Sequence, residues 1–215
     1  MKRLIFFGIA IALFLSFSTK KMVAQNQAVD MGLSVKWASC NLGASSPENS
    51  GDYYAWGEIS PKHYYTYGSL KYCSNTEGTF FTKYNNTSLN GSVDNKTRLE
   101  KSDDAAYAKL GKKWRTPTDA EWTELRENCT WKWTTFNGVG GFLVTSNRTH
   151  NSIFLPNTGQ YDGNSLIKIG SYWSSTRTPG HQEWAFGVFF VANGLVVRDS
   201  GPRYVGCSIR PVMDY

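Results

Sequence analysis

The pattern of hydrophobic and polar positions predicts one helix with a well-defined start. Thr118 and Glu121 form a capping-box sequence, in which the threonine hydroxyl accepts a backbone N–H of the first turn while the glutamate reaches back. Pro117 stands just before this pair, where its missing N–H costs nothing. Trp122 and Leu125 are three residues apart and therefore share one face. We predict a helix that begins after Thr118 and carries Trp122 into the core.

The rest of the chain is predicted to hold one shorter helix and many strands. The helix covers residues 103–110, is rich in alanine and ends at Gly111, a residue suited to a helix C-terminus. Asn193-Gly194 is the strongest hairpin-turn signal, and residues 137–141 form a second, glycine-rich hairpin loop. Short apolar runs and period-two alternation predict strands over residues 33–38, 52–58, 131–133, 142–144, 152–155, 184–192, 195–198 and 208–212.

Residues 60–92 differ from the segments around them. They are rich in Tyr, Asn, Ser, Thr and Gly and show no sustained period, so we predict a long surface excursion. No linker or clear internal repeat interrupts the chain after its first 24 residues. We therefore expect a single α+β domain over residues 25–215, with two helices, short antiparallel strands and long irregular loops.

The N-terminal segment has the layout of a secretory signal. Lys2 and Arg3 precede an apolar run of 14 residues from Leu4 to Phe17, and a small residue, Ala24, stands at the expected cut. The run is shorter than the roughly 20 residues of a spanning helix. We predict a signal peptide over residues 1–24, export to the cell surface, the medium or the periplasm, and no membrane insertion of the mature chain.

The net charge of the chain is much smaller when the predicted signal peptide is excluded. The full chain has a formal net charge of +6 at pH 7. Removing the four basic residues of the leader leaves 19 basic against 17 acidic residues, a net charge near +2. We therefore expect no nucleic-acid partner. The hydrophobic content of 40% and the aromatic content of 15% exclude intrinsic disorder.

Four cysteines in an exported chain predict two disulfides, whose connectivity the sequence leaves open. Buried free thiols are the alternative. The cysteines are Cys40, Cys73, Cys129 and Cys207, and no Cys-x-x-Cys occurs among them. The three histidines are scattered, so we predict no metal site and no cofactor.

The sequence around the predicted helix start resembles a known signature. Residues 114–122, Trp-Arg-Thr-Pro-Thr-Asp-Ala-Glu-Trp, are similar to the Arg-Leu-Pro-Thr-Glu-Ala-Glu-Trp motif of the formylglycine-generating enzyme superfamily, whose members have a C-type-lectin-like fold. The chain from Ala28 to its end more closely resembles the major paralogous domain named for Fibrobacter succinogenes and abundant in Bacteroidetes. The segments that carry this second resemblance are residues 28–38, 51–58, 114–122, 151–156, 172–175 and 208–212.

The resemblance implies a C-type-lectin-like fold and a bacterial secreted or cell-surface setting, but no reaction. The related oxidase binds copper through two cysteines close together in sequence near its C-terminus, whereas this chain has only Cys207 there. We therefore predict a protein that is not an enzyme. Calcium-dependent lectins carry Glu-Pro-Asn or Gln-Pro-Asp, and the nearest tripeptide here, Leu155-Pro156-Asn157, lacks the first ligand; whether calcium is needed stays open.

A ligand face is expected in the C-terminal half, where lectin-like folds commonly present one. Polar and aromatic side chains there can stack on sugar rings and orient them by hydrogen bonds. The alternative is an ordinary solvated loop. The candidate ligand-binding residues are His181, Gln182, Asn193, Arg198, Asp199, Arg203 and Tyr204.

A second group of residues is predicted to be structural. The tryptophans of the family-like motifs are expected in the core, and two arginines are expected to bond to backbone carbonyls or buried carboxylates. The group comprises Trp114, Arg115, Pro117, Trp122, Trp173, Trp184 and Arg210.

These observations favour a non-catalytic binding module, secreted or displayed on the cell surface, that recognises a glycan, glycoprotein or protein ligand. Carbohydrate binding and adhesion are the expected roles. Two alternatives stay open: a divergent enzyme of the formylglycine-generating type, and a structural component of a surface adhesive layer.

Overall fold

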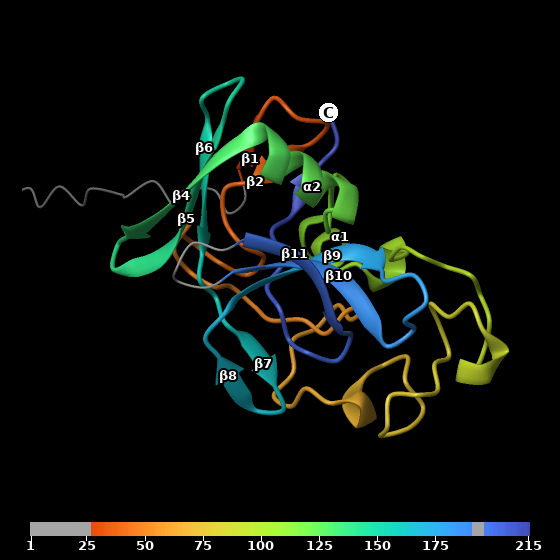
Figure 1. Ribbon diagram of the computed structural model, residues 1–215. Coiled ribbons are helices and arrows are strands. Elements are labelled where there is room, and N and C mark those ends of the chain that lie inside the picture. Colours follow the sequence, from red (N-terminus) through yellow and green to blue (C-terminus); the bar gives the residue numbers. More distant parts are fainter. Residues whose placement is uncertain (1–26, 191–195) are drawn as a thin grey trace, which may run out of the picture.

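The fold is α+β, and its described residues form two helices and many short antiparallel strands in several sheets (Figure 1). The computed structural model describes residues 27–190 and 196–215. The predicted signal peptide (residues 1–24) and the predicted Asn193-Gly194 turn lie outside these residues.

The elements follow in chain order. The helices are α1 (Ala105–Leu110) and α2 (Asp119–Asn128), with single 3-10 turns at Tyr67–Ser69, Ser88–Asn90 and Lys101–Asp103. The strands are β1 (Ala28–Val29), β2 (Lys36–Ala38), β3 (Trp114–Arg115), β4 (Cys129–Phe136), β5 (Val139–Ser146), β6 (Ser152–Pro156), β7 (Gln160–Asp162), β8 (Ser165–Ile167), β9 (Gly170–Arg177), β10 (Trp184–Phe190), β11 (Val196–Pro202) and β12 (Val212–Met213).

The capping box predicted for α2 is present. The Thr118 hydroxyl accepts from the Glu121 N–H at 3.2 Å, and the Glu121 carboxylate accepts from the Thr118 N–H at 2.7 Å. Trp122 and Leu125 are buried, as expected. Helix α1 starts at Ala105, later than predicted, because the Asp104 side chain caps it by accepting from two N–H groups of its first turn.

Across the described residues, the strands form four sheets. The order β1-β2-β12-β3 brings the two ends of the described chain into one sheet, and the others are β11-β10-β9, β4-β5-β6 and β7-β8. In Figure 1 the β4–β5 hairpin extends away from the helices, and residues 60–100 wind through the lower right of the molecule. The β4–β5 turn is Asn137-Gly138, with φ of 47° and 83°, the positive angles that a type I′ turn requires.

Arg210 crosses the interior and bonds to three separate segments. Its guanidinium donates to the carbonyls of Ala38 at 3.0 Å and Phe154 at 2.7 Å, and to the Asn41 side-chain oxygen at 2.8 Å. The predicted hydrogen bonds to backbone carbonyls are thus confirmed. Arg115 bonds instead to carboxylates, with both Glu121 oxygens at 2.6–2.8 Å.

The predicted core tryptophans fall into two groups. Trp122 and Trp173 are buried, and the Trp122 indole donates to the Trp173 carbonyl at 3.2 Å. Pro117 is buried beside the start of α2. Trp114, however, is only half-buried, and Trp184 is exposed, so the core prediction is wrong for Trp184 and only partly met for Trp114.

Two predictions about the N-terminal half are corrected. Residues 52–58 do not form a strand, because only Tyr54 bridges, to Cys207, while its neighbours pack irregularly in the core. The predicted surface excursion over residues 60–92 is partly interior: Tyr65, Phe81 and Tyr84 are among its fully buried side chains. The polar composition of this segment gave no sign of this burial, because tyrosine rings can pack in the core while their hydroxyls form hydrogen bonds.

The cysteines are free. Cys40, Cys129 and Cys207 are buried thiols, and Cys73 is half-buried. The prediction of two disulfides is therefore wrong, and the alternative of buried free thiols describes three of the four residues.

Candidate functional site

The structure divides the predicted ligand-binding residues between surface and interior. His181, Arg198 and Asp199 are exposed, Tyr204 is half-buried, and Gln182 and Arg203 are buried. Asn193 lies outside the described residues. The prediction of surface ligand binding is therefore wrong for Gln182 and Arg203, which are buried, and it stays a prediction for the other five residues.

Arg203 lies in the interior with 0% of its surface exposed. Its guanidinium carbon is 4.8 Å from the centre of the Trp56 ring and 4.9 Å from that of Phe81, distances of cation–π contacts. Burial, together with the nearby charge of Arg177, lowers the pKa of Arg203 to about 10. Arg203 cannot meet a ligand at the surface, because aromatic rings enclose it.

Gln182 is held by another buried arginine. Arg177 donates through one nitrogen to the Thr178 carbonyl and to the Gln182 side-chain oxygen, both at 2.8 Å. The Gln182 amide then donates to the Asn86 side-chain oxygen at 2.5 Å. Gln182 thus anchors the loop that follows β9 and is not available at the surface.

The two buried arginines together support the loop from Thr178 to Trp184, which we call the display loop. Arg203 donates from its side chain to the Gln182 carbonyl at 3.0 Å and from its backbone to the Glu183 carbonyl at 2.8 Å. The Thr178 N–H donates to the Trp184 carbonyl at 3.1 Å and closes the loop. These hydrogen bonds from the interior fix the backbone of the display loop, and its outer side chains therefore start from a defined position.

The outer side chains of the display loop are His181 and Trp184. Their ring centres are 5.6 Å apart, with 31° between the planes, and Trp184 is 36% exposed. The Glu183 carboxylate lies 3.3 Å from the His181 Nδ1 atom. An exposed indole flanked by an imidazole and a carboxylate is the kind of surface that stacks on a sugar ring and bonds to its hydroxyls.

The prediction of a core position for Trp184 rests on its grouping with the other tryptophans, most of which are buried. The sequence of β10 does not itself show which face is outward, and only the structure does so: Trp184 is exposed, Ala185 buried, Phe186 half-buried and Gly187 buried. Strand alternation places Trp184 and Phe186 on the same face, opposite Ala185.

Two of the other candidates, Arg198 and Tyr204, already have partners within the protein. Arg198 forms a two-bond ion pair with Asp119, both contacts at 2.7 Å, and its guanidinium carbon lies 4.0 Å from the Phe186 ring centre. Tyr204 packs edge-on against Tyr67, with ring centres 4.5 Å apart. These contacts connect β11 to α2 and the C-terminal loop to residues 60–92.

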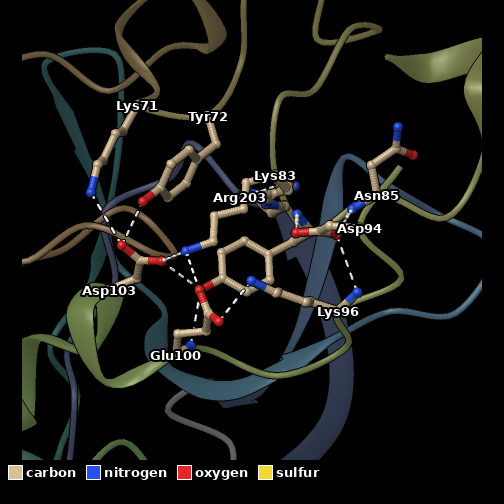
Figure 2. A network of polar contacts seen from close by, with 10 residues as sticks. Lys71, Tyr72, Lys83, Asn85, Asp94, Lys96, Glu100, Asp103 and Arg203 are labelled. Atoms are coloured by element: carbon tan, nitrogen blue, oxygen red, sulfur yellow. Dashed lines mark hydrogen bonds and ion pairs between the residues drawn. The ribbon is translucent and has the colours of Figure 1, made fainter. Parts of the chain in front are cut away.

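A buried carboxylate organises the chain next to Arg203 (Figure 2). Asp103 accepts from the Tyr72 and Tyr84 hydroxyls at 2.5 and 2.6 Å and from the Lys71 and Lys83 ammonium groups at 3.1 and 2.5 Å. Burial alone would raise the pKa of Asp103, but these four donors outweigh it and lower the pKa from 3.8 to about 2. Burial also raises the pKa of Tyr84, so its hydroxyl stays protonated and donates to the charged Asp103 carboxylate. The network thus joins a charged carboxylate to four donors.

Burial keeps two of the four thiols protonated. Burial raises the pKa of Cys129 to about 11 and that of Cys207 well above its ordinary value. Both groups are therefore protonated at neutral pH, and a protonated thiol is neither a nucleophile nor a metal ligand. Within residues 27–190 and 196–215, no three His, Cys, Asp or Glu side chains gather to hold a metal ion.

Within the same described residues, no helix is both long and apolar enough to span a membrane. Comparison of the chain with models of protein families, with curated proteins and with solved structures finds no match. The site must therefore be interpreted from its own geometry.

Proposed function

We propose that this protein is an exported, non-catalytic binding module that recognises a glycan or glycoprotein through the display loop, without a metal ion. The observation that carries the proposal is the exposed Trp184 ring beside His181 on a loop fixed by Arg177 and Arg203. A protein ligand would use the same aromatic surface.

Preorganisation supports this function. Binding is weakened by the entropy lost when loops and side chains become ordered. The hydrogen bonds of Gln182 and the backbone of Glu183 fix the display loop before any ligand arrives. Most of the entropy of ordering the display loop is therefore already lost when the protein folds, before a ligand binds.

The proposed setting and fold follow the resemblance to the Fibrobacter major paralogous domain. The α+β mixture of short antiparallel strands, two helices and long irregular segments supports a C-type-lectin-like fold. The signal-like leader supports export to the cell surface, and the presence of a single cysteine, Cys207, near the C-terminus supports a role without copper chemistry.

A glycan and mucin array tests the proposal. The purified protein is applied with calcium and with a chelator, alongside Trp184→Ala and the control Phe136→Ala. Phe136 is a comparably exposed aromatic residue, 42% exposed, at the end of β4. We expect chelator-resistant binding that Trp184→Ala removes and Phe136→Ala keeps. Absence of glycan binding, or loss with chelator, would overturn the metal-free glycan proposal.

A further inference from the structure

A basic groove lies between α1, β3 and the C-terminal segment, apart from the display loop. Its deeper part is a cavity of about 240 Å³, and a shallower hollow of about 390 Å³ shares three of its lining residues, Lys112, Lys113 and Asp214. We call the two together the basic groove.

Positive charge dominates the lining of the basic groove. Its cationic residues are Lys36, Arg98, Lys101, Lys112, Lys113 and Arg115. The lining has two side-chain carboxylates, and both are occupied within the protein. Asp104 accepts from the Thr116 N–H and hydroxyl at 2.8 Å each, and Asp214 pairs with Arg115 at 2.7 Å.

The exposed cations of the groove have no carboxylate of their own. Across the described part of the chain, no ion pair engages Arg98, Lys101, Lys112 or Lys113. Four exposed cations held near one cavity repel one another, and a bound anion would relieve this repulsion.

A buried hydroxyl in the groove lining also has no partner. Ser175 of β9 is 3% exposed, and its Oγ atom finds no hydrogen-bond partner in the described protein. An unpaired buried hydroxyl is unfavourable, and because Ser175 lines the deeper cavity, its hydroxyl is suited to pair with a ligand oxygen there. This observation is independent of the charge.

Aromatic rings flank the cations. The Lys36 ammonium lies 4.8 Å from the ring centre of Tyr215, the Lys101 ammonium lies 5.7 Å from that of Tyr107, and the half-buried Trp114 lines the cavity. Ring faces beside cations match a molecule that has both sugar rings and negative groups. A mature net charge near +2 is small for a protein that binds nucleic acid.

We infer that the basic groove binds the sulfate or carboxylate groups of an anionic polysaccharide. This inference rests on the proposed glycan-binding function, and it adds a ligand class and a second contact surface. Lys112 and Lys113 would meet the anionic group at the point where the two hollows join, and Ser175 would donate to it from the deeper cavity.

Calorimetric titration with four probes tests the groove: heparin, polygalacturonate, chemically desulfated heparin and a single-stranded DNA oligonucleotide. The wild type is compared with Lys112→Ala/Lys113→Ala and with Lys132→Ala/Lys168→Ala. Lys132 and Lys168 are exposed outside the groove, so the two double variants have equal net charge. A Ser175→Ala variant probes the deeper cavity without changing the charge.

We expect the dissociation constant for heparin or polygalacturonate to rise about tenfold in the groove variant and less than about twofold in the control. Ser175→Ala should weaken the same probe by about threefold. Equal losses in both lysine variants, or tighter binding of the DNA than of either polysaccharide, would overturn the inference. Neutral-glycan binding that depends on Trp184 while neither anionic probe binds would overturn the groove and leave the proposed function standing.

Discussion

Arg203 donates from its guanidinium to the carbonyl oxygen of Gln182 at 3.0 Å, and so a residue inside the core supports a loop at the surface. The guanidinium lies against the faces of Trp56, Phe81 and Tyr84 and has no carboxylate partner within the described residues. Packing against aromatic rings and hydrogen bonds to backbone carbonyls, and not an ion pair, therefore keep this charge in place.

Replacement of Arg203 should affect stability before it affects binding. Arg203→Ala removes a fully buried side chain and should lower the free energy of unfolding by about 3 kcal/mol. Urea unfolding followed by fluorescence measures the change. The matched control is Arg198→Ala, an arginine paired at the surface with Asp119, which should cost less than about 1 kcal/mol. Equal losses for the two variants would show that Arg203 is not the core support described here.

The Asp103 network predicts a specific loss of stability in acid. Because the pKa of Asp103 is lower in the folded protein than in the unfolded chain, its contribution is complete above about pH 5 and disappears as pH falls toward 2. A change from 3.8 to about 2 corresponds to about 2 kcal/mol.

Unfolding free energies between pH 2 and pH 7 check this contribution. Asp103→Asn should be less stable at neutral pH by about 3 kcal/mol, because Lys71 and Lys83 lose their shared counter-charge, and its stability should fall less steeply in acid. Asp199→Asn, at an exposed carboxylate outside the network, should follow the wild-type slope. Parallel curves for the wild type and Asp103→Asn would contradict the assignment.

The cysteines should behave as free thiols of unequal accessibility. Alkylation under denaturing, non-reducing conditions followed by mass spectrometry should label all four residues. In the native protein only the half-buried Cys73 should react readily, because Cys40, Cys129 and Cys207 are buried. A protein that is four mass units lighter than its reduced form, with no thiol to label, would instead restore the two-disulfide prediction.

Local signals in the sequence predicted the fold well where short-range hydrogen bonds decide it. The start of α2 depends on Thr118 and Glu121 alone, and the β4–β5 hairpin depends on a turn that Asn137-Gly138 can adopt. The strand pattern failed for β9, whose residues are buried on both faces and show no alternation. It also failed for residues 52–58, an aromatic run that fills the core without pairing as a strand.

The candidate site was harder to predict, because burial of charged groups depends on distant segments. Arg203 and Gln182 have the composition of a solvated loop, and only the approach of Trp56, Phe81 and Asn86 encloses them. Trp184 is the reverse case, since it was expected in the core with the other tryptophans and lies at the surface. The region predicted to bind ligand contains buried residues that fix the display loop and exposed residues that can meet a ligand. Only the tertiary contacts distinguish the two groups.

The most direct test of the account is the affinity of Trp184 variants for a glycan that binds the wild type on the array. Titration calorimetry of the wild type, Trp184→Phe and Trp184→Ala separates ring stacking from other contacts. We predict that Trp184→Ala weakens binding by about tenfold or more and that Trp184→Phe, which keeps an aromatic face, loses about threefold. Trp184 is 36% exposed, so part of its ring packs on the protein, and urea unfolding of each variant checks that it remains folded at the temperature of the titration. Wild-type affinity in a folded Trp184→Ala protein would contradict the claim that the display loop holds the ligand.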